Sequence, residues 1–140
     1  MESKKSKIKK TEYVLYYDWI ESTIARYPKA RRDVLTFIAK VNSFSEGLIC
    51  QDGVHSPIEK LFTCGFCYYF ALMLKDAFGG EIVWHKGYGH ILWRDNENLV
   101  YDIYGVYDDW EEGDMVSISE LGAALEDFRH RGIVEDVILC

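Results

Sequence analysis

The chain lacks a long hydrophobic run and a recognisable export signal. Its longest nearly apolar stretch, Leu61 to Leu74, is far shorter than the roughly 20 residues that a membrane-spanning helix needs. The N-terminus is basic, but no apolar segment with a small-residue cleavage site follows it, as a secretory signal would require. We therefore expect no membrane segment and a cytoplasmic protein.

The sequence contains four cysteines: Cys50, Cys64, Cys67 and Cys140. Without an export signal, thiols are the default state, so we expect no structural disulfide. The formal net charge is −7, and the acidic excess lies mainly between Asp95 and Asp136. This charge argues against nonspecific or direct nucleic-acid binding. It leaves the oligomeric state open.

What remains is enough apolar material for one core, since 49% of the residues are hydrophobic. Residues 1–10 carry five lysines and predict a flexible basic arm, and residues 11–140 predict a single domain. Apolar residues at helical spacing from Tyr13 to Tyr27 predict a first helix that Pro28 ends. A second stripe from Val34 to Val41 predicts another helix, and a loop is expected at 51–57.

The middle of the chain predicts a helix followed by a small sheet. Residues 67–78 are mostly good helix formers, and Gly79-Gly80 can close that helix. Three short β-type runs at 81–85, 90–94 and 99–104 predict an antiparallel meander. Ser117 with Glu120 predicts a capping box for a helix that carries Leu121, Leu125 and Phe128, and 133–139 predicts an edge strand. The fold class is therefore α+β.

Three residues in this region form a candidate catalytic triad. Cys67 is predicted at a helix N-terminus, where unpaired N–H groups and the helix dipole stabilise a thiolate and can bind an oxyanion. His90 begins a strand directly after Gly87-Tyr88-Gly89, and the two glycines allow another backbone segment or a substrate to approach closely. Asp102 lies in an otherwise apolar strand, so it needs a partner. A histidine across the hairpin would be that partner.

The pairing of His90 with Asp102 depends on strand register. If Arg94 pairs with Asn98 around a three-residue loop, His90 stands directly opposite Asp102. With a two-residue loop, the two residues fall on opposite faces and the triad needs a bulge.

One segment resembles the nucleophile segment of the papain family, C-G-[SA]-C-[WY]: it reads Cys64-Gly65-Phe66-Cys67-Tyr68-Tyr69-Phe70-Ala71. It departs from that pattern at Phe66, where the family has serine or alanine. The short spacing to His90 and then Asp102 looks more like the compact transglutaminase-like and NlpC/P60-type branches of that superfold. The overlap covers 64–105. Leu61 stands near the place of the papain oxyanion glutamine, so the expected oxyanion donor is the Cys67 backbone N–H.

The resemblance implies a papain-like or transglutaminase-like domain that needs no cofactor. His90 would take the proton of Cys67, Cys67 would attack a peptide or protein amide to form a thioester, and Asp102 would fix the histidine tautomer. Water as acceptor gives a protease, amidase or deamidase, an amine gives transglutamination, and another acyl acceptor gives a transferase. The sequence does not choose between them.

Two rival interpretations use the same residues. Cys64, Cys67, His85 and His90 could form a zinc site, but glycines interrupt the interval between the histidines and the flanks predict strands, so we expect no metal. The chain could also be a noncatalytic acidic protein that binds or inhibits a partner, such as a nucleic-acid-handling enzyme. Trp110, in a charged loop, is then either a loop anchor or a partner contact, and we favour the anchor.

Overall fold

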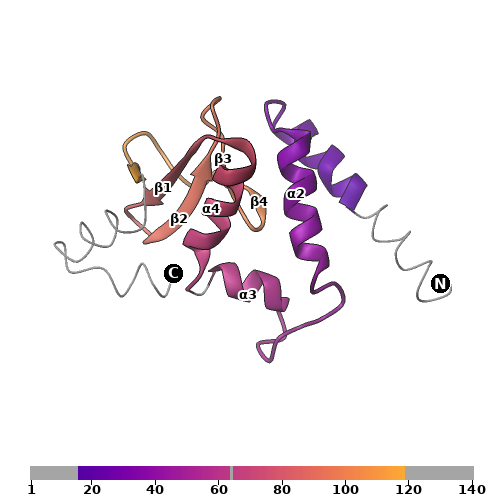
Figure 1. Cartoon of the computed structure of the whole chain (residues 1–140). Coiled ribbons are helices and arrows are strands. Elements are labelled where there is room, and N and C mark those ends of the chain that lie inside the picture. Colours follow the sequence, from indigo (N-terminus) through magenta and orange to yellow (C-terminus); the bar gives the residue numbers. More distant parts are fainter. Residues whose placement is uncertain (1–15, 64, 119–140) are drawn as a thin grey trace.

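The computed structural model describes residues 16–63 and 65–118, which form an α+β structure of helices and one antiparallel sheet (Figure 1). The predicted fold class is confirmed at this level. Predictions for the basic arm at 1–10, the helix from 121 to 128 and the strand at 133–139 lie outside the described residues.

The three helices that the sequence predicts within the described residues are present and end near the expected residues. Residues 16–26 are helical, and a turn follows at Pro28. Helix α2 spans Arg32–Ser43, α4 spans Cys67–Phe78, and a further short helix that was not predicted, α3, spans Pro57–Thr63. Gly79, at φ +78°, closes α4 and donates its N–H to the Lys75 carbonyl at 2.8 Å, a left-handed position that favours glycine.

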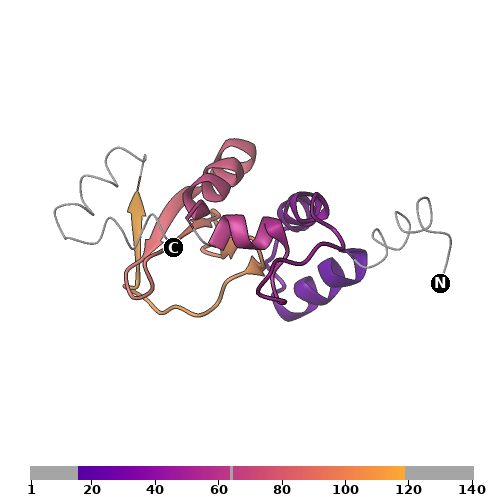
Figure 2. The ribbon, with the colours of Figure 1, turned by 90° about the horizontal axis from the view of Figure 1, so that it is seen from below.

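The sheet has five strands in the order β4-β3-β2-β1-β5. They are β1 (Glu81–His85), β2 (His90–Arg94), β3 (Val100–Asp102), β4 (Gly105–Val106) and β5 (Met115–Ile118). All neighbouring pairs are antiparallel. In the view from below, β5 and the helix at 16–26 lie at opposite ends of the molecule (Figure 2).

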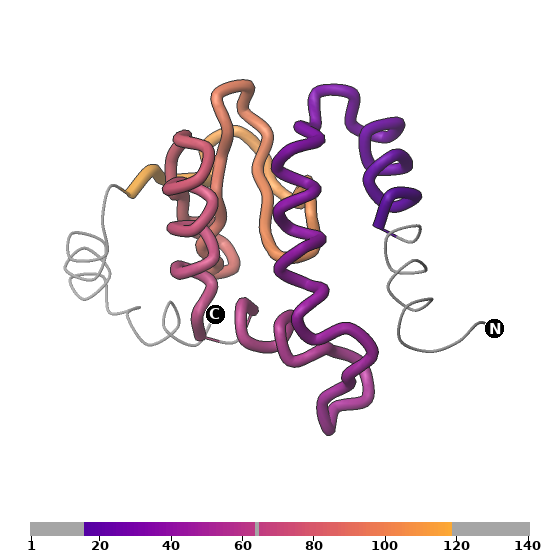
Figure 3. Tube along the Cα trace, turned by 45° about the vertical axis from the view of Figure 1, so that its right-hand side comes forward, coloured from indigo at the N-terminus to yellow at the C-terminus, as the bar shows by residue number. Residues whose placement is uncertain are grey.

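One face of the sheet packs against α4, and we call it the helical face. It is formed by Ile82, Trp84, Ile91, Trp93 and Tyr101, which are all buried. The buried stripe of α4 belongs to the same core cluster and consists of Cys67, Phe70, Ala71 and Leu74. In the view of Figure 3, the strands appear between α4 and α2. The packing of α4 on the helical face forms the main hydrophobic core.

The opposite face, which we call the loop face, carries Val83, Leu92 and Val100. Successive side chains of a strand point to opposite faces, so residues 85, 90 and 102 also belong to the loop face. The segment at 107–114 covers it, since Tyr107 and Trp110 pack against the three aliphatic residues. Trp110 is therefore a loop anchor, as predicted.

Two details of the predicted sheet are wrong. The strand expected at 99–104 is interrupted after Asp102 by a turn, and the chain returns as β4. Ser117 does not cap a helix, because it lies in β5 opposite Val83. Its hydroxyl instead hydrogen-bonds the Glu81 carboxylate on β1. Pairing with β1, which is distant in the sequence, determines the conformation of Ser117 and outweighs the local capping preference.

Within the described residues, no single helix is long and apolar enough to cross a membrane. Helices α3 and α4 reach that length and composition only as a pair, and they are bent by 96° at the break between them.

Candidate functional site

His90 and Asp102 form a partly buried pair on the loop face. The His90 Nε2 atom lies 3.2 Å from Asp102 Oδ2, and the two side chains are 16% and 10% exposed. The other carboxylate oxygen, Oδ1, accepts the backbone N–H of Tyr104 at 2.8 Å. Two hydrogen bonds therefore compensate the burial of this carboxylate, as its position in an apolar strand required.

The register that brings these residues together differs from both predicted registers. Arg94 pairs with Val100, which places Leu92 opposite Asp102 and His90 one diagonal step away on the same face. The connection is a five-residue loop, 95–99, in which the Asp95 carboxylate accepts the N–H of Leu99 at 3.0 Å. The predicted pairing of His90 with Asp102 is thus present, through a longer loop than either alternative.

Aromatic rings surround the pair. The ring centroid of Tyr107 lies 6.0 Å from that of His90 and 6.1 Å from that of His85. His85 also stacks on Tyr88 at 4.6 Å, and its Nε2 atom lies 3.2 Å from the Asp109 carbonyl oxygen. Burial, together with nearby carboxylates, raises the pKa of Tyr107 to about 12. The phenol therefore stays protonated at neutral pH.

Cys67 is the first residue of α4, as predicted, but its environment is not that of a free nucleophile. The residue is 3% exposed and is disulfide-bonded, whereas Cys50 is a free thiol. The expectation that no disulfide forms is wrong for Cys67. The absence of an export signal bears on the redox compartment, whereas disulfide formation also depends on how close two cysteines lie in the fold.

The structure does not bring Cys67 and His90 to one surface. Cys67 packs in the core cluster with Ile91 and Trp93 on the helical face. His90 alternates with these residues along β2 and contacts Tyr107 on the loop face. Both residues lie toward the same end of the sheet, but the sheet itself separates the sulfur from the imidazole.

The zinc alternative gains no support from the described residues. His85 and His90 lie on the loop face, Cys67 is oxidised, and Cys64 lies outside the described residues. In the described parts of the chain, no group of three or more histidine, cysteine, aspartate or glutamate side chains could hold a metal ion.

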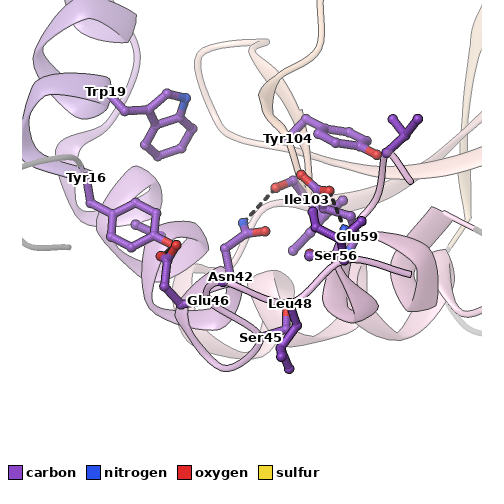
Figure 4. A pocket seen from close by; sticks show the side chains of 14 residues that line it. Tyr16, Trp19, Asn42, Ser45, Glu46, Leu48, Ser56, Glu59, Ile103 and Tyr104 are labelled. Atoms are coloured by element: carbon purple, nitrogen blue, oxygen red, sulfur yellow. Dashed lines mark hydrogen bonds between the residues drawn. The ribbon is translucent and has the colours of Figure 1, made fainter. Parts of the chain in front are cut away.

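A cavity of about 610 Å³ lies elsewhere, between the helix at 16–26, α2, α3 and the turn after β3 (Figure 4). Its walls include Tyr16, Trp19, Glu46, Leu48, Glu59 and Tyr104. The sequence alone does not predict this cavity. Its signal there is a set of aliphatic residues in a polar loop, Leu48, Ile49 and Val54, and the other cavity walls come from distant parts of the chain.

No protein-family model, no curated protein and no solved structure matches this chain.

Proposed function

We propose that the chain is a noncatalytic binding domain that engages a basic surface of a protein partner through residues 107–114, which we call the acidic loop. The proposal depends chiefly on one observation: Trp110 anchors this loop on the aliphatic residues of the loop face, so that its carboxylates are held in place. A nucleic-acid-handling enzyme, whose working surface is basic, is the kind of partner that such a loop fits.

Several hydrogen bonds fix the loop beyond the packing of Trp110. The Trp110 indole donates to the Tyr107 carbonyl at 3.2 Å, and Asp114 closes a turn by accepting the Glu111 N–H at 2.8 Å. The Asp114 carbonyl accepts the Lys86 N–H at 2.9 Å, which ties the loop to the β1–β2 turn. A preorganised loop loses little conformational entropy on binding, so more of its contact energy contributes to affinity.

The charge of the loop has one sign over a short distance. Five carboxylates lie within seven residues: Asp108, Asp109, Glu111, Glu112 and Asp114. The Arg26 guanidinium approaches Asp108 at 3.8 Å, and both side chains are well exposed, so this contact neutralises little of the charge. A concentrated negative surface attracts a basic partner and accelerates encounter at low salt.

We favour a binding function over a catalytic one because of the positions of Cys67 and His90. Thiol catalysis needs the imidazole within hydrogen-bond reach of the sulfur. Here the two residues occupy opposite faces of the sheet, and moving His90 to the other face would require a one-residue slip of β2. Such a slip would also expose Ile91 and Trp93.

Fluorescence anisotropy with a labelled arginine-rich peptide tests the binding function. The double change Glu111→Gln and Glu112→Gln should weaken binding by roughly three- to tenfold at low salt, since exposed charge pairs contribute about 0.2–1 kcal/mol each. The matched control is Asp18→Asn with Glu97→Gln, which removes the same charge from exposed positions outside the loop. Equal effects of the two double variants would refute a role for the loop.

A second candidate function is thiol-dependent acyl transfer on a papain-like or transglutaminase-like fold. The pair of His90 with Asp102, at 3.2 Å, favours it, because a carboxylate orients a catalytic imidazole in this way. In this candidate the reduced Cys67 thiol gives its proton to His90 and attacks a peptide or protein amide carbonyl. The amine leaves with that proton, and water or another acceptor releases the acyl group from the thioester.

Intact mass spectrometry after incubation with nitrophenyl acetate tests the second candidate. A catalytic Cys67 in the reduced protein should acquire one acetyl group rapidly, and both Cys67→Ala and His90→Ala should abolish this fast labelling. Labelling that is slow and independent of His90 would eliminate acyl transfer by these residues.

A further inference from the structure

The cavity beside the turn after β3 has walls suited to an apolar ligand. Trp19, Tyr16 and Tyr104 supply aromatic surface, and Leu48 and Ile49 line it while remaining 55% and 61% exposed. A volume of about 610 Å³ falls within the range typical of small-molecule and side-chain pockets. Large apolar side chains gathered at an open cavity indicate a binding surface.

The charge of the cavity is negative. Its lining includes the carboxylates of Glu46 and Glu59 and, among the described residues, no lysine, arginine or histidine. His55 and Lys60 lie near this region, and the His55 ring centroid is 6.5 Å from that of Tyr104, but both side chains contact Asp52, at 2.8 and 3.2 Å. Backbone N–H groups of His55 and Val54 hold the pKa of Asp52 well below its usual range, so its carboxylate pairs with the Lys60 ammonium and accepts a hydrogen bond from the His55 ring.

Hydrogen bonds fix the polar groups of the lining, as Figure 4 shows in part. The Tyr16 hydroxyl donates to Glu46 Oε1 at 2.6 Å, and Glu59 Oε1 accepts the Ser56 N–H at 2.9 Å. Each contact occupies Oε1, and within residues 16–63 and 65–118 the second oxygen of both carboxylates is left for a ligand. Asn42 donates to the Ile103 carbonyl at 3.0 Å and ties α2 to the turn that carries Tyr104.

The aromatic wall is likewise held in position. Gly105 follows this turn at φ +112°, and a Cβ atom there would lie 2.9 Å from the Trp19 ring. The glycine therefore lets the indole pack directly on the backbone. Tyr104, another wall of the cavity, is held by its backbone N–H, which donates to the Asp102 carboxylate.

We infer that this cavity binds an organic cation on an apolar stem, as a lysine or arginine side chain of a peptide presents it. The apolar stem would lie against the rings and Leu48, and the cationic group would reach the carboxylates of Glu46 and Glu59. Aromatic faces add cation–π attraction. The site is distinct from the acidic loop and uses neither Cys67 nor His90, so it stands independently of both proposed functions.

Three probes of similar shape test this inference by proton–nitrogen NMR titration of the full chain. Phenethylamine carries a positive charge, phenethyl alcohol is neutral and phenylacetate is negative. Phenethylamine should shift the Trp19 indole and Gly47 amide signals with a dissociation constant on the order of 1 mM, as expected for a ligand of this size. The alcohol should bind at least about fivefold more weakly, and phenylacetate should not bind.

Matched variants locate the site. Glu46→Gln combined with Glu59→Gln should remove the preference for the amine over the alcohol, while leaving the binding of the alcohol unchanged. Glu111→Gln with Glu112→Gln makes the same charge change on the acidic loop and should leave amine binding unchanged. Failure of the acidic loop to bind an arginine-rich peptide would not alter these results, so the two proposals fail separately.

Two outcomes would overturn the inference. The first is equal binding of all three probes, which would mean that charge plays no part in recognition. The second is a shift of the Trp19 and Gly47 signals on dilution of the protein alone, which would mean that a second copy of the chain occupies the cavity.

Discussion

His90 and Tyr104 are joined through one carboxylate: Asp102 holds the imidazole with Oδ2 at 3.2 Å and the Tyr104 N–H with Oδ1 at 2.8 Å. The loop face and the cavity behind the turn after β3 therefore share a structural element. A substitution of Asp102 should therefore affect both His90 on the loop face and Tyr104 at the cavity.

Replacing Asp102 with alanine should lower the free energy of unfolding by about 1–3 kcal/mol, because the partly buried Tyr104 N–H loses a charged acceptor and His90 loses its partner. Asp102→Asn keeps a carbonyl oxygen at that position and should cost less. Denaturant unfolding of both variants measures the difference. Equal losses would contradict the role assigned to the bond with Tyr104.

A methyl group at Gly80 should destabilise the protein strongly. The backbone there has φ +72°, and a Cβ atom would lie 2.5 Å from the Arg94 carbonyl oxygen. Gly53 is the matched control, since its φ is +73° and nothing lies within 4 Å. Gly53→Ala should cost about 1 kcal/mol from backbone strain alone, and Gly80→Ala at least about 2 kcal/mol more. Thermal or denaturant unfolding that ranks them equally would argue against this packing of Gly80 on β2.

Trp110→Ala should release the acidic loop from the sheet. The amide of Glu111 should then exchange hydrogen faster, because its bond to Asp114 depends on a fixed loop. Trp110→Phe keeps an apolar anchor but loses the indole N–H, so it should accelerate exchange much less. Binding of the arginine-rich peptide should weaken in the same order as exchange increases. Unchanged exchange in Trp110→Ala would contradict the anchoring role.

Alkaline pH should destabilise the fold through Tyr101. Burial raises the pKa of this phenol to about 12, from an ordinary value near 10 in the unfolded chain. The stabilising contribution is complete below pH 10 and is lost as pH rises toward 12, because the unfolded state releases its proton first. At about 1.36 kcal/mol per pKa unit, the full loss should amount to about 3 kcal/mol. Tyr101→Phe should reduce the slope of this part of the profile and leave the share of Tyr107, whose pKa is raised to a similar value; an unchanged slope in that variant would exclude Tyr101 as a cause.

The local features of the fold were predictable because their signals lie in adjacent residues. The spacing of Cys67, Phe70, Ala71 and Leu74 gave α4 its buried stripe, and Gly79 marked its end. The burial of Asp102 in an apolar strand correctly pointed to a partner across the hairpin, and that partner is His90. A buried carboxylate needs a hydrogen bond whatever the exact register.

Features that depend on distant pairing were not predictable. The face on which His90 lies is set by the alternation of β2 against α4, and the sequence does not show which face that helix covers. The position of Ser117 in β5 depends on pairing with Val83, 34 positions away, which a local capping pattern cannot reveal. The cavity is assembled from four separate segments, so no one of them carries its signature.

Labelling of Cys67 with iodoacetamide across a pH series, followed by peptide mapping, distinguishes a noncatalytic protein from a thiol enzyme. We expect Cys67 to resist labelling until a reductant is added, while Cys50 reacts without it. After reduction, Cys67 should react slowly in the folded protein, with the pH dependence of an ordinary buried thiol and with no effect of His90→Ala. Rapid labelling of reduced Cys67 well below pH 8, slowed by His90→Ala, would show that sulfur and imidazole meet and would contradict the noncatalytic account.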